Sequence, residues 1–480
     1  MDLTANEFGD IPADVFRAEL HKLADWIADY RGNIEQYRVA PNGAPGSIAQ
    51  RLPKQAPEHG ESFDEIFADF ENILLPGVLH WGHPQFAAYF GCTTTAPGIE
   101  AEMLTAALNV NAFTWRVCPV ATELETVVIG WLRQWLRLPE SFGGVVYDTA
   151  SVGIMHALAV AREQAAPCTR KLGLTGRSLP RFRVYTSDQA HSSVEKAVIA
   201  LGLGEENVRR VPSDRDFRLN VDELRRLIAA DVDAGYRPLA CVATVGTTST
   251  ASVDPVAEIA DVCQQHELWL HIDGAYGAGL ALLPEREAIT AGWDRADSIV
   301  VNPHKMLFVP FDFSVLYVRD LERLRRVFTL VPEYLRGDTV DAEKNYMDYG
   351  VQLGRRFRAL KVWMIFRTFG RAGIAARIRE HLRLARLIGD WIRADDRFEL
   401  AAPVVMGVIC FRLVRNDAAE ADQLNAQIVE TINTSGAAYL NQTKLNGRTV
   451  IRVGLGNILT TEKHLRNIWD LIQKTADELL

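Results

Sequence analysis

Apolar residues repeat at helical spacing near the amino terminus, over residues 16–30 and again over residues 63–74. In each stretch they recur every three or four positions and so fall on one face of a helix. A connector rich in proline and glycine, residues 41–57, separates the two. Two amphipathic helices with so little core of their own predict an arm, residues 1–86, that packs on the main body or on a second subunit.

From about residue 145 the pattern becomes an alternation of short apolar runs and helical stretches. The runs are rich in β-branched and aromatic residues, which are typical of buried strands; they lie at residues 145–147, 182–186, 239–245, 268–273, 298–301 and 313–318. This alternation predicts an α/β fold over residues 87–380, with a mostly parallel, doubly wound sheet covered by helices on both faces.

The last hundred residues contain fewer and more widely spaced strand signals. Strand candidates at residues 404–413 and 448–455 are combined with helical stretches near residues 419–434 and 462–480. We therefore expect a small α+β domain over residues 381–480.

Two helix starts carry specific signals. Thr122 and Glu125 form a T-x-x-E capping box, which predicts a helix beginning at Thr122. Asp254 followed by Pro255 has the residue order expected of an N-cap and a first helical position.

Composition narrows the classes of function. The 480 residues are 48% hydrophobic and 24% charged, as in a globular protein, and the net charge of −9 argues against nucleic acid or an anionic membrane as the main partner. No apolar run is long enough to span a membrane, and the first ten residues are acidic rather than signal-like. These two features lead us to expect a cytoplasmic location. The six cysteines form no CxxC pair, so we expect neither a disulfide framework nor a zinc site.

Lys305 follows the predicted strand at residues 298–301, in the motif NPHK. The carboxyl ends of parallel strands are where open α/β sheets bind ligands. A lysine between apolar stretches is partly desolvated there, which lowers its pKa and leaves a neutral amine able to form a Schiff base. The alternative is an ordinary lysine whose amine reaches solvent.

Asp273 closes another predicted strand, residues 268–273. A carboxylate at the end of so apolar a strand needs a partner, and a protonated pyridine nitrogen would serve, with the small Ala275 letting a ring lie flat nearby. An arginine is an alternative partner. A metal is another, since His271 points to the same side of the strand, but no third ligand is apparent and we expect no metal.

Two further strand ends carry residues that suit the same ligand. Ala150 and Ser151 open a helix whose free N–H groups can bind a phosphate, although ordinary capping explains them equally well. His191 could stack on a flat ring or hold a carboxylate, although a structural histidine is the commoner case. Together, the four strand ends match the residue types needed to bind pyridoxal 5′-phosphate (PLP).

At this point the sequence resembles a known family. The motifs TELETVV, SDQAHSSVEKA, ATVGTT, WLHIDGAYG, NPHK and LGRRFRALK occur in the order found in PLP-dependent group II amino-acid decarboxylases, most closely the aromatic-L-amino-acid decarboxylases. The resemblance runs from about Asp10 to the carboxyl terminus. It implies the type I aminotransferase-like PLP fold and an intertwined homodimer with its active sites at the subunit interface.

The resemblance also implies roles for individual residues. Lys305 matches the Schiff-base lysine, Asp273 the partner of the pyridine nitrogen and His191 the residue that stacks on the ring. Tyr334 matches the tyrosine of a mobile loop that protonates the carbanion, and aldehyde-forming relatives have phenylalanine there. The remaining cofactor-binding matches are Ala150, Ser151, Thr248, Ala275, Asn302 and His304.

A set of substrate-binding positions follows from the same resemblance: Trp81, Tyr89, Phe90, Cys92, Asn111, Phe113, Leu353 and Gly354. The chain departs from the family at Gly91 and Cys92, where proline and threonine are usual, and at Asn111, where animal enzymes have an apolar residue. A buried asparagine there would need a hydrogen-bond partner, which favours a substrate bearing a hydroxyl or N–H group.

The expected function is PLP-dependent α-decarboxylation of an L-amino acid to the amine and CO2, with an aromatic amino acid as the expected substrate. The alternatives are decarboxylation of a non-aromatic amino acid such as glutamate, histidine or diaminobutyrate, an aldehyde-forming oxidative reaction, and a dimeric scaffold without cofactor. A nucleotide-binding oxidoreductase is disfavoured because no GxGxxG motif follows a strand.

Overall fold

The computed structural model describes residues 10–330 and 344–480. These residues form two compact units. The smaller comprises residues 10–89, 413–453 and 459–480, and the larger comprises residues 90–330, 344–412 and 454–458. The three-part division at residues 86 and 380 stays a prediction.

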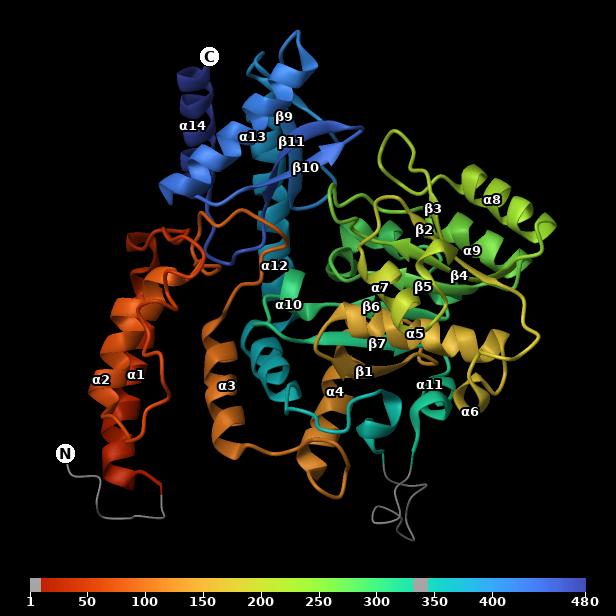
Figure 1. Cartoon of the computed structure of the whole chain (residues 1–480), viewed down its shortest axis with the longest axis horizontal. Helices are drawn as coiled ribbons and strands as arrows, with labels where there is room; N and C mark the ends of the chain where they lie inside the picture. Colours follow the sequence, from red (N-terminus) through yellow and green to blue (C-terminus); the bar gives the residue numbers. More distant parts are fainter. Residues whose placement is uncertain (1–9, 331–343) are drawn as a thin grey trace. The chain divides into compact units, whose positions relative to one another are not determined.

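The larger unit is built on a seven-stranded sheet with the order β1-β7-β6-β5-β4-β2-β3 (Figure 1). Strand β7 runs antiparallel to both of its neighbours, β1 and β6, and all the other pairs of this sheet are parallel. The mostly parallel sheet predicted from the sequence is confirmed, and the carboxyl ends of the other strands meet at one edge. The strands are β1 (Gly143–Tyr147), β2 (Phe182–Ser187), β3 (Val208–Val211), β4 (Arg237–Thr244), β5 (Trp269–Asp273), β6 (Ser298–Val301) and β7 (Ser314–Val318).

Helix α5 (Ala150–Ala165) lies across five strands of this sheet, β1, β4, β5, β6 and β7. Helix α5 can approach the sheet closely because small residues line its buried face. A Cβ at Gly153 would lie only 2.9 Å from the side chain of Val300, so the absent side chain brings the helix down onto β6. The other helices of this unit are α3 (Ala96–Leu108), α4 (Pro119–Trp135), α6 (Thr169–Leu172), α7 (Ser193–Ala200), α8 (Val221–Asp233), α9 (Val256–Gln265), α10 (Pro303–Met306), α11 (Leu321–Phe328) and α12 (Ala359–Arg393).

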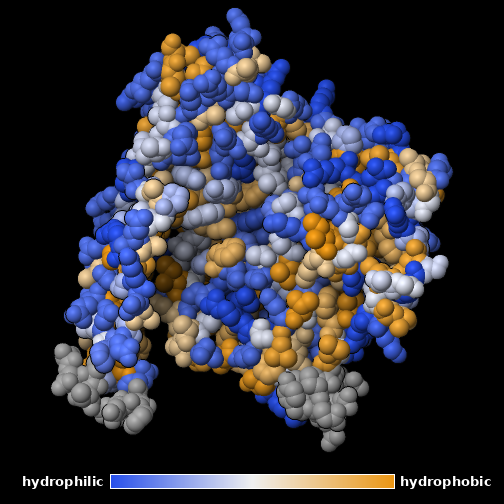
Figure 2. Space-filling view, in the orientation of Figure 1, coloured by the Kyte–Doolittle hydropathy of each residue, from blue (hydrophilic) through white to orange (hydrophobic). Residues whose placement is uncertain are grey.

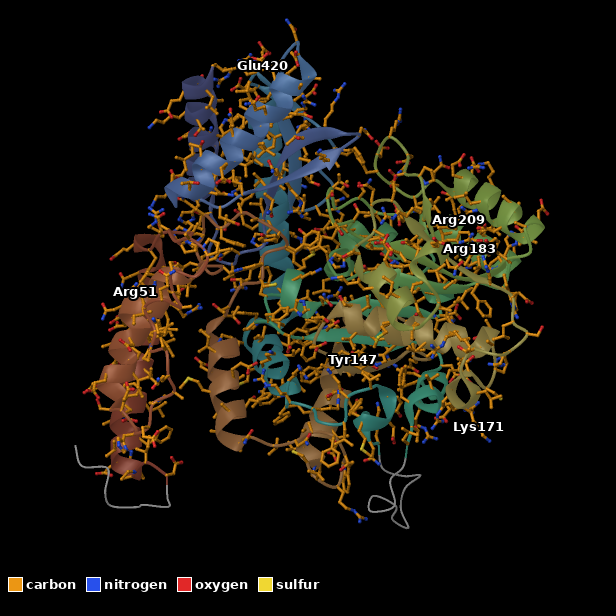
Figure 3. The ribbon with its side chains drawn as sticks, viewed as in Figure 1. Arg51, Tyr147, Lys171, Arg183, Arg209 and Glu420 are labelled. Atoms are coloured by element: carbon orange, nitrogen blue, oxygen red, sulfur yellow. The ribbon has the colours of Figure 1, made fainter. Side chains whose placement is uncertain are left out.

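A buried carboxylate fastens α8 to the far edge of the sheet. Asp231 accepts hydrogen bonds from Arg209 at 2.6 Å and from the hydroxyl of Tyr185 at 3.0 Å. Arg183 approaches the same carboxylate at 3.5 Å, and Figure 3 shows Arg183 and Arg209 together on this side of the unit. The charge of Asp231 is thus compensated inside the protein, as a buried carboxylate requires.

Both predicted helix starts are wrong. Helix α4 begins at Pro119, with Cys118 as its N-cap residue, and Thr122 lies inside it, donating from Oγ1 to Cys118 O at 3.5 Å. Helix α9 has Pro255 as its N-cap residue. The Asp254 carboxylate instead accepts from the backbone of Leu219 and Thr244. In both places a carboxylate binds the backbone of residues outside the helix, Glu125 of α4 accepting from Val146 and Asp254 from the two residues above, which local sequence rules do not anticipate.

The smaller unit contains the two amino-terminal helices expected from the sequence. Helix α1 (Ala13–Gly32) packs on α2 (Phe63–Asp69) through Trp26, whose ring lies 6.0 Å from that of Phe67. Helix α1 has no buried residue, in keeping with an arm that has little core. The unit also contains α13 (Ala418–Ser435), α14 (Glu462–Leu479) and the antiparallel pair of β10 (Asn441–Leu445) with β11 (Arg448–Gly454).

Strands β8 (Phe398–Leu400) and β9 (Val408–Leu413) follow α12 in the chain. Within residues 10–330 and 344–480, no helix has the length and apolar character needed to cross a bilayer. Figure 2 shows hydrophilic residues spread among hydrophobic ones over the face it presents.

Candidate active site

A cavity of about 190 Å³ lies at the carboxyl edge of the parallel strands. Five strands or the turns that follow them contribute to its wall, namely β1, β2, β4, β5 and β6. This is the position at which open α/β sheets bind ligands. The lining residues are Phe90, Thr149, Ala150, Ser151, His191, Ser193, Thr244, Gly246, Thr248, Asp273, Ala275, Tyr276, Asn302, His304, Lys305 and Phe311.

Lys305 enters the cavity from α10, the single turn that follows β6. Its Nζ lies 4.9 Å from the centroid of the Phe90 ring, and that ring stacks on Tyr276 at 4.0 Å. The preceding residue, His304, is buried and accepts the Phe313 N–H at Nδ1. Burial, with the positive charge of Lys305, lowers the pKa of His304 to about 3, so this histidine is neutral beside the amine.

Asp273 is the last residue of β5, the strand paired with β6, and is 5% exposed. Its Oδ1 accepts the Ala275 N–H at 3.1 Å, which fixes the carboxylate at the strand end. His271, two residues earlier, hydrogen-bonds to Ser298 Oγ at 2.8 Å, and burial lowers its pKa to about 4. Within the described parts of the chain, no three His, Cys, Asp or Glu side chains come together as a metal site.

The amino end of α5 faces the cavity through Ala150 and Ser151. Thr149 occupies the N-cap position, but its side chain makes no capping hydrogen bond. Asp148, one residue earlier, accepts the Thr149 N–H at 2.6 Å. The first N–H groups of the helix are therefore open to an anion, which the helix dipole also attracts.

His191 stands in the turn between β2 and α7, and Ser193 fixes its orientation. The Ser193 N–H donates to His191 Nδ1 at 3.1 Å, and Ser193 Oγ lies 2.8 Å from the same atom. Because Nδ1 accepts, the neutral ring carries its proton on Nε2. Partial desolvation lowers the pKa of His191, Asp273 opposes this effect and Lys305 adds to it.

Two unsatisfied polar atoms give independent support for PLP as the ligand of this cavity. Two buried atoms of its wall, Thr244 Oγ1 and Asn302 Oδ1, have no hydrogen-bond partner among the described residues. Buried polar atoms are nearly always satisfied, so a polar ligand is expected to complete them. An amine, a buried carboxylate and an open helix terminus around one ring-sized space supply the groups that hold an aldehyde, a pyridine nitrogen and a phosphate.

The predicted substrate residues fall into three places. Phe90 lines the cavity, and Cys92 lies close enough for the charge of Lys305 to affect its thiol. Burial raises the pKa of Cys92 to about 11, so the thiol is neutral. Trp81 and Tyr89 belong to the smaller unit, where their rings stack at 5.4 Å.

The other four predicted substrate residues, Asn111, Phe113, Leu353 and Gly354, are not among the described residues that line the cavity. Asn111 is exposed, not buried as expected, and its Oδ1 accepts the Arg355 N–H at 2.9 Å. This bond places Asn111 beside Gly354. Leu353 is 49% exposed.

Tyr334 lies outside the described residues. The sequence analysis did not single out several residues that line the cavity: Thr149, Ser193, Thr244, Gly246, Tyr276 and Phe311. Two of them could have been found, because Ser193 lies in SDQAHSSVEKA and Thr244 in ATVGTT. Gly246 has a φ of +93°, and a Cβ there would lie 2.9 Å from Gly277 N, which explains the glycine of that second motif.

Comparison with known proteins agrees with this site. The family model described as the pyridoxal-dependent decarboxylase conserved domain matches residues 45–414. The chain is 36% identical to an aromatic-L-amino-acid decarboxylase of Catharanthus roseus over 485 residues, covering 99% of this chain and 96% of that protein. It is also 35% identical to a phenylacetaldehyde synthase of Arabidopsis thaliana, covering 96% and 95% of the two chains.

Among solved structures, the chain is similar to the TDC of Oryza sativa, whose crystal structure contains PLP and tryptamine. The TM-score is 0.94 at 37% sequence identity, and the match covers 98% of this chain and 99% of that one. The likeness therefore extends over nearly the whole of both chains.

Proposed function

The chain belongs to the pyridoxal-dependent decarboxylase family, and on that premise we propose that it removes the α-carboxylate of an aromatic L-amino acid as CO2 and releases the amine. The observation that carries this proposal is the convergence of Lys305, Asp273 and the amino end of α5 on one cavity. The similar proteins of Catharanthus roseus and Oryza sativa support an aromatic substrate.

PLP, when bound, accepts the electron pair of the breaking bond into its pyridine ring. In our proposal Lys305 Nζ would hold the cofactor through its aldehyde carbon, the aldehyde oxygen leaving as water, and the Asp273 carboxylate would accept the N–H of the ring nitrogen. The N–H groups at Ala150 and Ser151, with Thr248 and Asn302 nearby, hold the phosphate. His304 is neutral and adds no positive charge beside Lys305.

His191 is proposed to lie over the ring and to orient the substrate. With Nδ1 occupied by Ser193, its Nε2–H can donate to the substrate carboxylate. This hydrogen bond would hold the carboxylate in the orientation that the loss of CO2 requires. After CO2 leaves, Tyr334 is proposed to donate a proton to the α-carbon, an assignment that rests on the sequence resemblance alone.

We further propose that the active protein is a homodimer in the cytoplasm. Apolar side chains are exposed on and near α3, with Leu104, Leu108 and Val120 between 51% and 61% exposed, and a second copy would cover them. The exposed Asn111, Leu353 and Gly354, with the half-buried Phe113, would then line the substrate site of the partner. All six cysteines are free thiols, which suits a reducing compartment.

A second candidate reaction is oxidative conversion of the amino acid to an aldehyde. It is favoured by the 35% identity to phenylacetaldehyde synthase. Tyr334 argues against it, because the aldehyde-forming relatives have phenylalanine at that position.

A panel of L-amino acids incubated with the purified enzyme and PLP, with products identified by mass spectrometry, tests the proposal. We expect amines from tryptophan, tyrosine, DOPA or phenylalanine and none from glutamate, histidine or diaminobutyrate. Aldehyde as the main product would support the second candidate, and turnover of only the non-aromatic substrates would contradict the aromatic assignment.

A further inference from the structure

Thr244, the last residue of β4, carries a buried hydroxyl that the proposed mechanism does not use. The residue is 3% exposed and lines the cavity. Its Oγ1 makes no hydrogen bond with the described residues. Thr186, on the neighbouring strand β2, is buried to a similar degree but donates its hydroxyl to Val242 O at 3.1 Å. A buried threonine in this sheet can thus be satisfied by the backbone, and Thr244 is not.

The backbone fixes where the Thr244 side chain points. Asp254 accepts the Thr244 N–H at 2.7 Å and donates its own N–H to Thr244 O at 3.0 Å. In the parallel pairing of β4 with β5, Thr244 lies opposite Asp273. Residues opposite each other on neighbouring strands project from the same face of the sheet, so the hydroxyl stands on the same side as the Asp273 carboxylate.

We propose that the Thr244 hydroxyl donates a hydrogen bond to the phenolic oxygen of the pyridoxal ring. The inference rests on the proposed function, since it needs PLP in this cavity. The ring nitrogen donates to Asp273 in this proposal, and the phenolic oxygen is the hydrogen-bond acceptor attached directly to the ring. It lies on the edge opposite the carbon that carries the phosphate arm.

The strand order indicates which edge of the pyridoxal ring faces β4. The phosphate-binding end of α5 follows β1, which lies on one side of β5, and β4 lies on the other side. A ring anchored by its nitrogen at the end of β5, with its phosphate arm towards α5, turns its phenolic edge towards β4. Thr244, at the end of β4, carries the unsatisfied hydroxyl that would face this phenolic edge.

The test compares two ligands, PLP and its 3-deoxy analogue, which lacks the phenolic oxygen. Both are titrated into cofactor-free wild type, Thr244→Val and Thr244→Ser, and dissociation constants are read from the quenching of tryptophan fluorescence. We expect Thr244→Val to bind PLP about five- to tenfold more weakly, the usual effect of one lost hydrogen bond. It should bind the analogue as wild type does, and Thr244→Ser should restore PLP binding.

The stability of the cofactor-free protein gives a second readout, with Thr186→Val as the matched control. Valine has nearly the shape of threonine, so Thr244→Val removes an unsatisfied hydroxyl and should leave thermal stability unchanged or higher. Thr186→Val removes a satisfied hydroxyl and should lower the thermal stability. It should not change the ratio of the dissociation constants for PLP and the 3-deoxy analogue.

Three results would overturn the contact: unchanged PLP binding by Thr244→Val, an equal loss for both ligands, or destabilisation of cofactor-free Thr244→Val as large as that of Thr186→Val. A wild-type protein that binds no PLP would overturn the proposed function together with this contact. Wild type that binds PLP while Thr244→Val binds it equally well would overturn the contact alone.

Discussion

Arg355 donates a 2.7 Å hydrogen bond from Nη2 to Oε1 of Glu125 in the interior of the larger unit. The two residues are 8% and 3% exposed. Both also bind the backbone of Val146, where Glu125 accepts the N–H at 3.1 Å and Arg355 donates to the carbonyl at 2.8 Å. The pair therefore joins α4 and β1 to the segment that carries Leu353 and Gly354.

Replacing Arg355 by methionine should strongly destabilise the protein. The change leaves the Glu125 carboxylate buried without its cation, which typically costs about 3–5 kcal/mol. Urea unfolding of the cofactor-free protein measures the free energy of unfolding. Arg356→Met is the control, because the Arg356 side chain is 54% exposed and pairs with Glu102 near the surface, so its loss should cost no more than about 1 kcal/mol. Equal effects of the two substitutions would contradict the structural role given to Arg355.

Acid should destabilise the cofactor-free protein in part through His271. Burial lowers the pKa of this histidine from 6.5 to about 4 in the folded state, with Asp273 acting in the opposite direction. The unfolded chain therefore binds an additional proton between pH 6.5 and 4, and stability falls as the pH falls through that window. His271→Gln should reduce the slope by up to about 1.4 kcal/mol per pH unit.

Urea unfolding at several pH values between 4 and 7 measures this slope. It should not vanish in His271→Gln, because burial also lowers the pKa of His156 to about 4. Asp254 acts in the opposite sense, since burial raises the pKa of its carboxyl to about 7 and favours the protonated form in the folded state. A His271→Gln protein with the wild-type slope would show that His271 is not held neutral by burial.

Tyr334→Phe should change the product. Without a proton donor for the α-carbon, the carbanion persists and reacts with oxygen, so we expect amine formation to fall and aldehyde and ammonia to appear in air. Product analysis under air and under nitrogen checks this. Unchanged amine output would remove Tyr334 from the mechanism.

Two inactive variants should restore activity when they share a dimer. Lys305→Ala lacks the cofactor lysine, and Leu353→Glu places a charge in the group proposed to line the partner's site. A mixed dimer carries both changes in one site and neither in the other, so random mixing should recover about a quarter of wild-type activity. Co-expression with two affinity tags isolates the mixed dimer, which should have about half of wild-type activity because one of its two sites is intact. No recovery would indicate that Leu353 serves the site of its own chain.

The strand ends were the most predictable part of this protein. The apolar run at residues 298–301 is β6 in the structure, and residues 269–273 of a second run are β5. The end of a short buried strand can be predicted from the sequence, because the first polar residue after the apolar run leaves the sheet. The sequence alone therefore predicts Lys305 and Asp273 at one edge of the sheet.

Residues that depend on distant partners could not be predicted in this way. Glu125 looked like a capping residue, yet it pairs with Arg355, 230 positions away. Asp254 looked like an N-cap, yet it holds the end of β4. The role of Thr244 could not be predicted from the sequence, because it depends on a buried hydroxyl without a hydrogen-bond partner, and only the packed structure shows this.

The most direct test of the central claim is to locate the cofactor on the chain. The purified protein is incubated with PLP, reduced with sodium borohydride, digested and examined by mass spectrometry. Reduction converts a Schiff base into a stable secondary amine, so we expect one pyridoxyl phosphate group per chain, on the peptide that contains Lys305. A group on a different lysine, or none on any peptide, would contradict the role proposed for Lys305.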